Sequence, residues 1–271
     1  MKRPNLIVLL ACPLLLVGSV STGWADDAEF DETRVIIEIN GTDGDVGFHA
    51  TFDADAWYNV QMHDPLDQKV FQEKAFGSLK TQGLTENFFE SAEPLCLPDP
   101  EDEEELVVAL AEFLDRFPAG EYILSGKNNE NEFLSGSAEL TWNIPAAPDI
   151  SETDEEEFDS AEDVVLEWAE GDDLGGKCDD GDLVSDGIIP APGDVAEVGW
   201  EVVVEPDCDV DFDPERVFSA QLPPDYTSVT VPEEFLQSYL DEDCSEFKFE
   251  VGAIEASGNQ TFSEGGFEID D

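Results

Sequence analysis

Apolar and polar residues alternate in short runs along most of the chain, which is the pattern of half-buried β-strands. The first half holds four such runs, at 33–41, 46–53, 56–64 and 69–77. The polar segments 53–55 and 64–67 separate them, and residues 120–142 predict a hairpin around the polar turn 127–131. Runs of this length and spacing predict a β-sandwich.

One stretch of the first half has a helical period instead. Residues 101–117 place six apolar side chains on a single helix face: Leu106, Val107, Leu110, Phe113, Leu114 and Phe117. The acids at 101–105 would lie at the positive end of the helix dipole, and Pro118 would end the helix. We predict a helix over 101–117 that covers one edge or end of the sandwich, with its acidic first turn in solvent rather than on a metal ion.

The N-terminus has the three parts of a secretory signal peptide. Lys2 and Arg3 precede the apolar run 6–20, and small residues lead to a cleavage site after Ala25. An alternative is lipidation at Cys12, whose preceding residues resemble a lipoprotein cleavage site. No later segment approaches the roughly 20 apolar residues of a membrane span. We expect a secreted or periplasmic protein.

The charge of the chain restricts its partners. The formal net charge is −56, and removal of residues 1–25, which contain Lys2, Arg3 and no acid, takes it to −58. Such a charge keeps a protein soluble and excludes nucleic acid, whose binders need a basic surface. Because 41% of residues are hydrophobic and 10% aromatic, the chain still has enough apolar side chains to form cores. The acids then lie on the surface, where cations screen them. This favours halophilic adaptation over an ordinary acidic secreted protein.

Proline-containing residues 143–160 divide the chain, which predicts domains at 26–145 and 146–271. In the second half, 162–170, 198–205, 227–236 and 247–269 resemble a fibronectin type III domain. The resemblance implies Trp168 on strand B, 227–236 as strand E and the turn after it, and Phe247 at the start of strand F. The loop 170–195 and the insertion 206–218 depart from that family. The whole chain is also similar to exported bacterial proteins of unknown function that pair a β-rich leader with such a domain.

We therefore expect an all-β protein of two β-sandwich-like domains, the first with one inserted helix and the second of the fibronectin type III or immunoglobulin-like class. Cleavage would leave four cysteines, which allow three disulfide connectivities: Cys96, Cys178, Cys208 and Cys244. The fibronectin-like arrangement implies Cys208–Cys244 at one pole and Cys96–Cys178 between the domains. Because His49 and His63 are the only histidines and no C-x-x-C pair exists, a zinc site is not expected.

Clustered acids suggest calcium, a hard cation that takes oxygen ligands. The candidate ligands are Asp43, Asp45, Asp179, Asp180, Asp182, Asp207, Asp209, Asp211 and Asp213. No EF-hand spacing is present, and in 205–215 the informative residue is Cys208 rather than the acids. Trp57 and Tyr58 form the one aromatic pair that we single out for ligand contact, since neighbouring strand residues face opposite ways.

Catalytic signatures are weak. The chain has no G-x-S-x-G elbow and no phosphate-binding loop, and His49 and His63 fall in strand-like runs. We expect an exported, non-enzymatic binding, adhesion or envelope-scaffold protein without a cofactor, whose partner is a protein or a polysaccharide. The alternatives are a calcium-stabilised structural protein and, further off, a polysaccharide-acting enzyme that uses a carboxylate pair.

Overall fold

The structure is a computed structural model that describes residues 28–98, 106–150, 156–158, 160–161, 164–178, 180–208, 210, 212, 214 and 216–270. The expected signal peptide and the acids at 101–105 lie outside these ranges. The described chain is mostly β, with a large mixed sheet, a small second sheet and three α-helices, as the alternation predicted. None of the helices in the described ranges is long and apolar enough to cross a bilayer.

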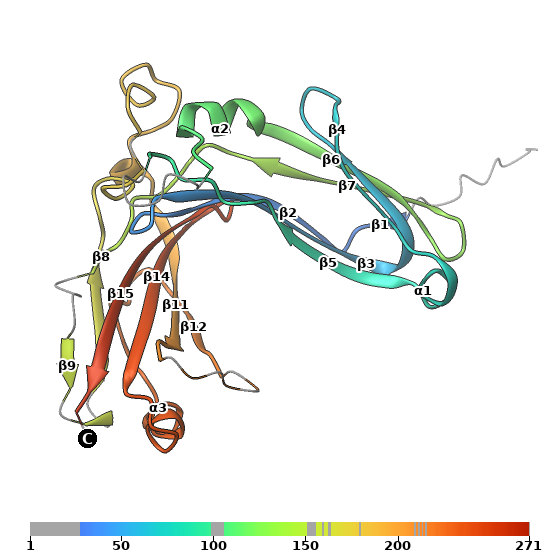
Figure 1. The fold of residues 1–271 in the computed structure, drawn as a ribbon. Helices are drawn as coiled ribbons and strands as arrows, with labels where there is room; N and C mark the ends of the chain where they lie inside the picture. The colour runs from blue at the N-terminus through green and yellow to red at the C-terminus, as the bar shows by residue number, and fades with distance from the viewer. Residues whose placement is uncertain are drawn as a thin grey trace, which may run out of the picture.

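The first lobe is a two-layered sandwich (Figure 1). Its elements are β1 (Ala28–Glu29), β2 (Glu32–Asn40), β3 (Asp45–His63), β4 (Lys69–Lys74), α1 (Gly77–Gln82), β5 (Leu84–Glu90), α2 (Leu110–Arg116), β6 (Gly120–Asn128) and β7 (Phe133–Leu140). One layer holds β2, the first half of β3 and β5. The other holds β4, the second half of β3, β6, β7 and β1.

Strand β3 is continuous where the sequence predicted a turn at 53–55. It pairs with β2 and β5 through its first half and with β6 and β4 through its second half. Its register against β5 shifts between Asp53 and Trp57, so the strand bends from one layer into the other instead of ending. A bulge of this kind bends a strand while keeping the backbone hydrogen-bonded on both sides.

The predicted helix is shorter than expected. Leu110, Phe113 and Leu114 are buried on α2, and the Phe117 ring stacks on Phe48 with centroids 4.5 Å apart. Residues 106–109 are not helical, because their backbone is hydrogen-bonded to Leu95 on both sides. Leu106 is therefore 61% exposed rather than part of a buried helix face. The backbone pairing with Leu95 thus prevails over the helical spacing of the apolar residues.

The second lobe is a smaller sandwich. Its elements are β8 (Asp149–Ile150), β9 (Glu156–Phe158), β10 (Val165–Ala169), the 3₁₀ turn η2 (Pro192–Asp194), β11 (Glu197–Pro206), β12 (Phe218–Leu222), β13 (Ser228–Thr230), α3 (Glu233–Leu240), β14 (Glu246–Glu255) and β15 (Gln260–Ile269). The order β12–β11–β14–β15 forms one layer and β13–β10–β8 the other. Trp168 and Trp200 meet edge to face between them, with ring centroids 6.1 Å apart. The segment predicted as strand E and a turn is a short strand followed by helix α3.

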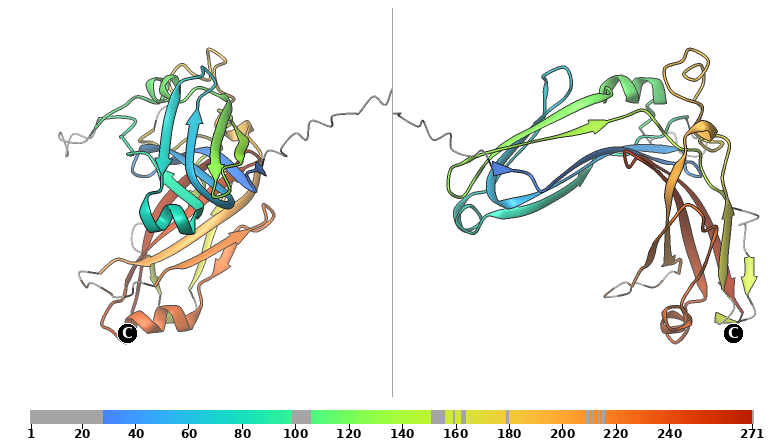
Figure 2. Two further views of the ribbon diagram at one scale, coloured as in Figure 1. Left: turned by 90° about the vertical axis from the view of Figure 1, so that its right-hand side faces the viewer. Right: turned by 180° about the vertical axis from the view of Figure 1, so that it is seen from behind.

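The two lobes share one sheet. Strand β15 pairs in parallel with β2, placing Gln260, Thr261 and Phe262 opposite Glu38, Ile39 and Asn40. The main layer of the second lobe thus continues into the lower layer of the first, and the molecule bends sharply at this junction (Figures 1 and 2). The bend is built into backbone hydrogen bonding rather than left to a flexible linker.

Side chains of β15 and the turn before it hold the linker, residues 141–148, against the second lobe. The fully buried Asn259 donates from Nδ2 to the carbonyls of Thr141 and Asn143, and its Oδ1 accepts the Ile37 amide. The Thr261 and Ser263 hydroxyls donate to the carbonyls of Pro145 and Pro148. Thr261 and Ser263, which face the same side of β15, thus each supply a hydrogen-bond donor to a carbonyl of the proline-containing linker.

Two disulfides brace this arrangement. Cys96 is bonded to Cys178 across the lobes and Cys208 to Cys244 within the second lobe, with Cα atoms 5.0 and 5.9 Å apart. These are the pairs that the fibronectin-like arrangement implied. The segment around Cys178 also packs on the first lobe, since its core includes Leu174, Leu183 and Ile189.

Candidate functional site: the inner face of the bend

The outward-facing side chains of the two lobes meet inside the bend. Because Ile37 and Ile39 point into the first core, Glu38 between them points the other way. On β14, Phe249 and Val251 point into the second core, so Glu250 points outward. We use the term inner acidic face for the outward carboxylates that converge here: Glu38, Glu93, Glu201, Glu205, Glu250 and Glu264.

A histidine lies at the centre of the first-lobe part of this face. His49, on β3, is 6% exposed and has a carboxylate at each ring nitrogen. Its Nε2 lies 3.2 Å from Glu93 Oε1, within hydrogen-bonding distance, and its Nδ1 lies 3.7 Å from Glu38 Oε2. One oxygen of each carboxylate and one ring nitrogen all lie within 4.8 Å of one another. This is the one such group of potential metal ligands within the ranges that the structure describes.

The cluster has unusual proton affinities. The pKa of Glu38 is raised to about 7, mainly by burial and also by the charges of Glu93, Glu250 and Glu201, although the charge of His49 lowers it. Burial also lowers the pKa of His49, but the hydrogen bond with Glu93 and the charge of Glu38 outweigh burial, so the net pKa is raised. The charges of Glu250 on β14 and Glu201 on β11 thus act on Glu38 on β2, from one lobe to the other.

Local pairing fixes these side chains. Glu38 lies on β2 opposite Gly47, two residues before His49 on the same face of β3. Glu93 follows β5 in a segment anchored on both sides, because Ser91 Oγ accepts the Phe48 amide and the Pro94 carbonyl accepts the Val46 amide. The Phe88 ring meets His49 edge to face at 5.9 Å.

The second-lobe part is a carboxylate ladder. Glu250 lies directly opposite Glu264, and burial together with this mutual repulsion raises the pKa of Glu250. Burial and the charge of Asp43 likewise raise the pKa of Glu264. Lys248 Nζ lies 3.3 Å from Glu205 Oε2 and is the cation paired with this ladder. The face as a whole is suited to binding positive charge.

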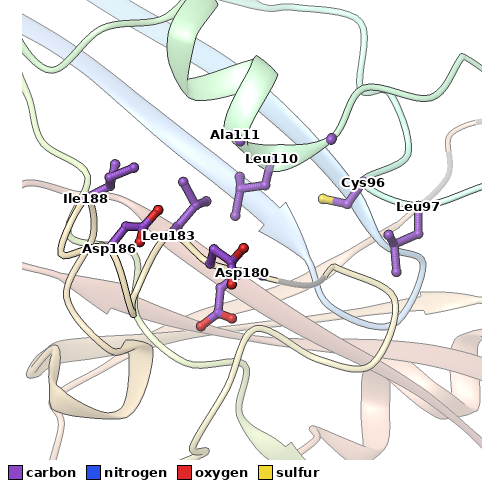
Figure 3. A pocket seen from close by; sticks show the side chains of 11 residues that line it. Cys96, Leu97, Leu110, Ala111, Asp180, Leu183, Asp186 and Ile188 are labelled. Carbon is purple, nitrogen blue, oxygen red and sulfur yellow. The ribbon is translucent and has the colours of Figure 1, made fainter.

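The predicted calcium ligands that the structure describes lie in different places. Asp180 and Asp182 line a pocket of about 430 Å³ between the lobes, together with Asp186 (Figure 3). Its other walls are apolar and include Leu110 and Leu183. Asp179 lies outside the described residues.

Among the described residues, the other predicted calcium ligands are Asp43, Asp45 and Asp207, which do not line this pocket. Asp207 is exposed and lines a pocket of about 200 Å³ near Phe247, whereas Asp209, Asp211 and Asp213 lie outside the described residues. Asp43 is held in the turn after β2, where its amide donates to Asn40 Oδ1 and its carboxylate accepts from Asn40 Nδ2. Asp45 begins β3.

Of the aromatic pair Trp57 and Tyr58, only Tyr58 is accessible to a ligand. Trp57 is fully buried in the first core, so the prediction that it contacts a ligand is wrong. Tyr58 faces the other way: its hydroxyl donates to Asn131, and Lys80 Nζ lies 4.4 Å from its ring centroid. As expected from strand geometry, only one of two adjacent residues can point outward.

No protein-family model matches the chain, and no curated protein matches it in sequence. Among solved structures, a bacterial ice-binding adhesin of 1.5 MDa is 13% identical with a TM-score of 0.25, covering 90% of this chain and 66% of that chain. A Ca²⁺-stabilised adhesin from an Antarctic bacterium is 13% identical with a TM-score of 0.24, covering 88% and 49%.

Trypsin-activated α-2-macroglobulin from Escherichia coli is 9% identical with a TM-score of 0.28, covering 88% of this chain and 15% of that chain. The chain thus spans two thirds or less of the length of these structures.

Proposed function

We propose that the protein is an exported, non-enzymatic binding or scaffold protein that receives a positively charged partner on the inner acidic face. The convergence of the outward faces of both lobes into one acidic surface carries this proposal. The shared β2–β15 pairing and the Cys96–Cys178 bond support a fixed angle between the lobes. A rigid, pre-shaped surface binds with a smaller loss of conformational entropy than a flexible one.

Several sequence-based expectations belong to the same proposal. Two disulfides are typical of exported proteins, which supports the signal peptide cleaved after Ala25 and a secreted or periplasmic location. Two separate cores support a division into domains 26–145 and 146–271, although the segment around Cys178 packs on the first core. The layers β13–β10–β8 and β12–β11–β14–β15 support a fibronectin type III-like second domain.

The carboxylates that face one another across His49 support a binding role over catalysis. Glu38 and Glu93 both contact the imidazole ring, so neither is free to protonate a leaving group while the other attacks.

The binding proposal is tested with a labelled oligolysine peptide as a probe of cationic partners. The variant Glu250→Gln/Glu264→Gln should bind it several-fold more weakly than the wild type at low salt, because it removes two charges of the inner acidic face. The matched control is Glu121→Gln/Glu139→Gln, since these residues also lie directly opposite one another on neighbouring strands but on β6 and β7. Equal losses in both variants would mean that the peptide senses only net charge, and the proposal would fail.

A calcium-stabilised structural protein is the second candidate. One observation favours it: Asp180, Asp182 and Asp186 line the same pocket between the lobes, beside the inter-lobe disulfide (Figure 3). Carboxylates so placed could hold a hard cation. Thermal melts in micromolar CaCl₂, compared with NaCl of equal ionic strength, test this function. Stabilisation by calcium alone that Asp182→Asn abolishes would support it, and identical melts in the two salts would refute it.

A further inference from the structure

We propose that Glu38, His49 and Glu93 bind one divalent transition-metal ion, with Zn²⁺ as the representative probe. The donors are one imidazole nitrogen and two carboxylate oxygens, all within 4.8 Å of one another. Tetrahedral ligands about 2.0–2.1 Å from a zinc ion are about 3.3 Å apart. The contact of 3.2 Å between His49 Nε2 and Glu93 Oε1 already matches this separation.

A space is kept open beside these atoms. At Gly47, a Cβ atom would lie 2.6 Å from Glu93 Oε1 and 2.8 Å from His49 Nε2, closer than non-bonded atoms tolerate. Any other residue at this position would push Glu93 away from His49. Glycine on a strand often marks such a close approach, and here it lets two potential ligands meet.

The surrounding charges favour a cation. With a neutral imidazole, Glu38 and Glu93 carry two negative charges, and Glu201 and Glu250 act on Glu38 from the second lobe. Lys248, the nearby basic residue, is paired with Glu205. These like charges repel one another, and a divalent ion bound between the two carboxylates would compensate them.

The donor set selects the class of metal. An imidazole nitrogen suits zinc and its neighbours in the first transition row, whereas Ca²⁺ takes six to eight oxygens. The sequence argued against zinc because it contains only two histidines and no C-x-x-C pair. At this site two carboxylates and one histidine on a strand provide the ligands, and no cysteine pair is needed. The site would also fix the segment after β5 to β2 and β3 inside the bend. It does not depend on the proposed cationic partner.

The experiment is titration of ZnCl₂ into the full chain by calorimetry, with excess CaCl₂ and NaCl present to occupy non-specific acidic sites. One Zn²⁺ ion should bind per chain, and His49→Gln and Glu93→Gln should each weaken binding by about tenfold or more. His63→Gln is the matched control, because it removes the other histidine of the same strand and should leave affinity unchanged.

A second measurement, on the wild-type protein, does not depend on whether the variants fold. If His49→Gln does not fold, ¹⁵N-labelled wild type still distinguishes the two imidazoles. Zn²⁺ should shift the ring nitrogen resonances of His49 and not those of His63. Absence of stoichiometric binding, unchanged affinity in Glu93→Gln, or equal shifts of both histidines would overturn the proposal.

Discussion

Cys96, in the first lobe, is covalently bonded to Cys178, in the loop that leads out of strand β10 of the second lobe. The bond lies beside the pocket that Asp180 and Asp182 line. It therefore braces a bend that backbone pairing already sets.

Removing this bond with Cys96→Ser/Cys178→Ser should lower the free energy of unfolding by roughly 2–5 kcal/mol. The two cysteines are 82 residues apart, so their bond restricts a long stretch of the unfolded chain. Denaturant melts under non-reducing conditions measure the loss. The radius of gyration from small-angle scattering should stay the same, because β2–β15 and Asn259 still hold the bend. An expanded native state would show that the disulfide sets the angle.

Asn259→Ala should destabilise the protein by roughly 3 kcal/mol. The substitution leaves the buried Ile37 amide, and the carbonyls of Thr141 and Asn143, without their side-chain partner. Ser263→Ala provides the comparison: it removes one hydrogen bond, to Pro148, and should cost about 1 kcal/mol. If the two substitutions cost the same in urea melts, Asn259 is not the central link of the junction.

Glu264→Gln tests the carboxylate ladder. The pKa values of Glu250 and Glu264 are raised in the fold, so the native state binds more protons than the unfolded chain once the pH exceeds their ordinary value of 4.5. Stability from these groups is complete below that value and is lost as the pH rises through the raised values. Glu264→Gln should therefore be more stable than wild type at pH 8, by up to about 1 kcal/mol after solvent screening, and not at pH 4.

The control for this prediction is Glu139→Gln, on strand β7 opposite Glu121 and outside the bend. Its effect should stay within about 0.5 kcal/mol at both pH values. A pH-independent gain in Glu264→Gln would point to packing rather than charge as its cause.

Sodium chloride should raise the melting temperature of the whole protein. The formal net charge of −56 makes the folded chain repel itself, and the screening length falls from about 10 Å at 0.1 M salt to about 3 Å at 1 M. An uncharged osmolyte at matched osmolality separates charge screening from general exclusion effects. A melting temperature that responds equally to both would argue against adaptation to high salt.

Much of the fold could be predicted from the alternation of apolar and polar residues, because a strand with one buried face has an apolar residue at every second position. The hairpin β6–β7 has the predicted turn. The prediction failed where long-range pairing replaced a local preference. Residues 53–55 look like a turn but lie in a strand that changes partners, and Leu106 has a helical period but pairs its backbone with Leu95.

The inner acidic face was beyond sequence reasoning for a similar reason. His49 was predicted as a sheet residue, and it is one, but its neighbours Glu38 and Glu93 come from 11 and 44 positions away. Nothing in a chain with 67 acids distinguishes these two until the register of β2 against β3 is known. The glycine at 47, opposite Glu38 and two residues before His49, was the one local signal.

The parallel pairing of β2 with β15 makes the two halves of the gene product interdependent. A fragment that carried either half alone would expose a bare strand edge at the former junction, and an open edge recruits other chains into aggregates. Domains joined by a flexible linker can be duplicated or exchanged one at a time, whereas separating these lobes would leave that strand edge unpaired. Both lobes therefore have to be kept together when the protein is truncated or fused to another chain.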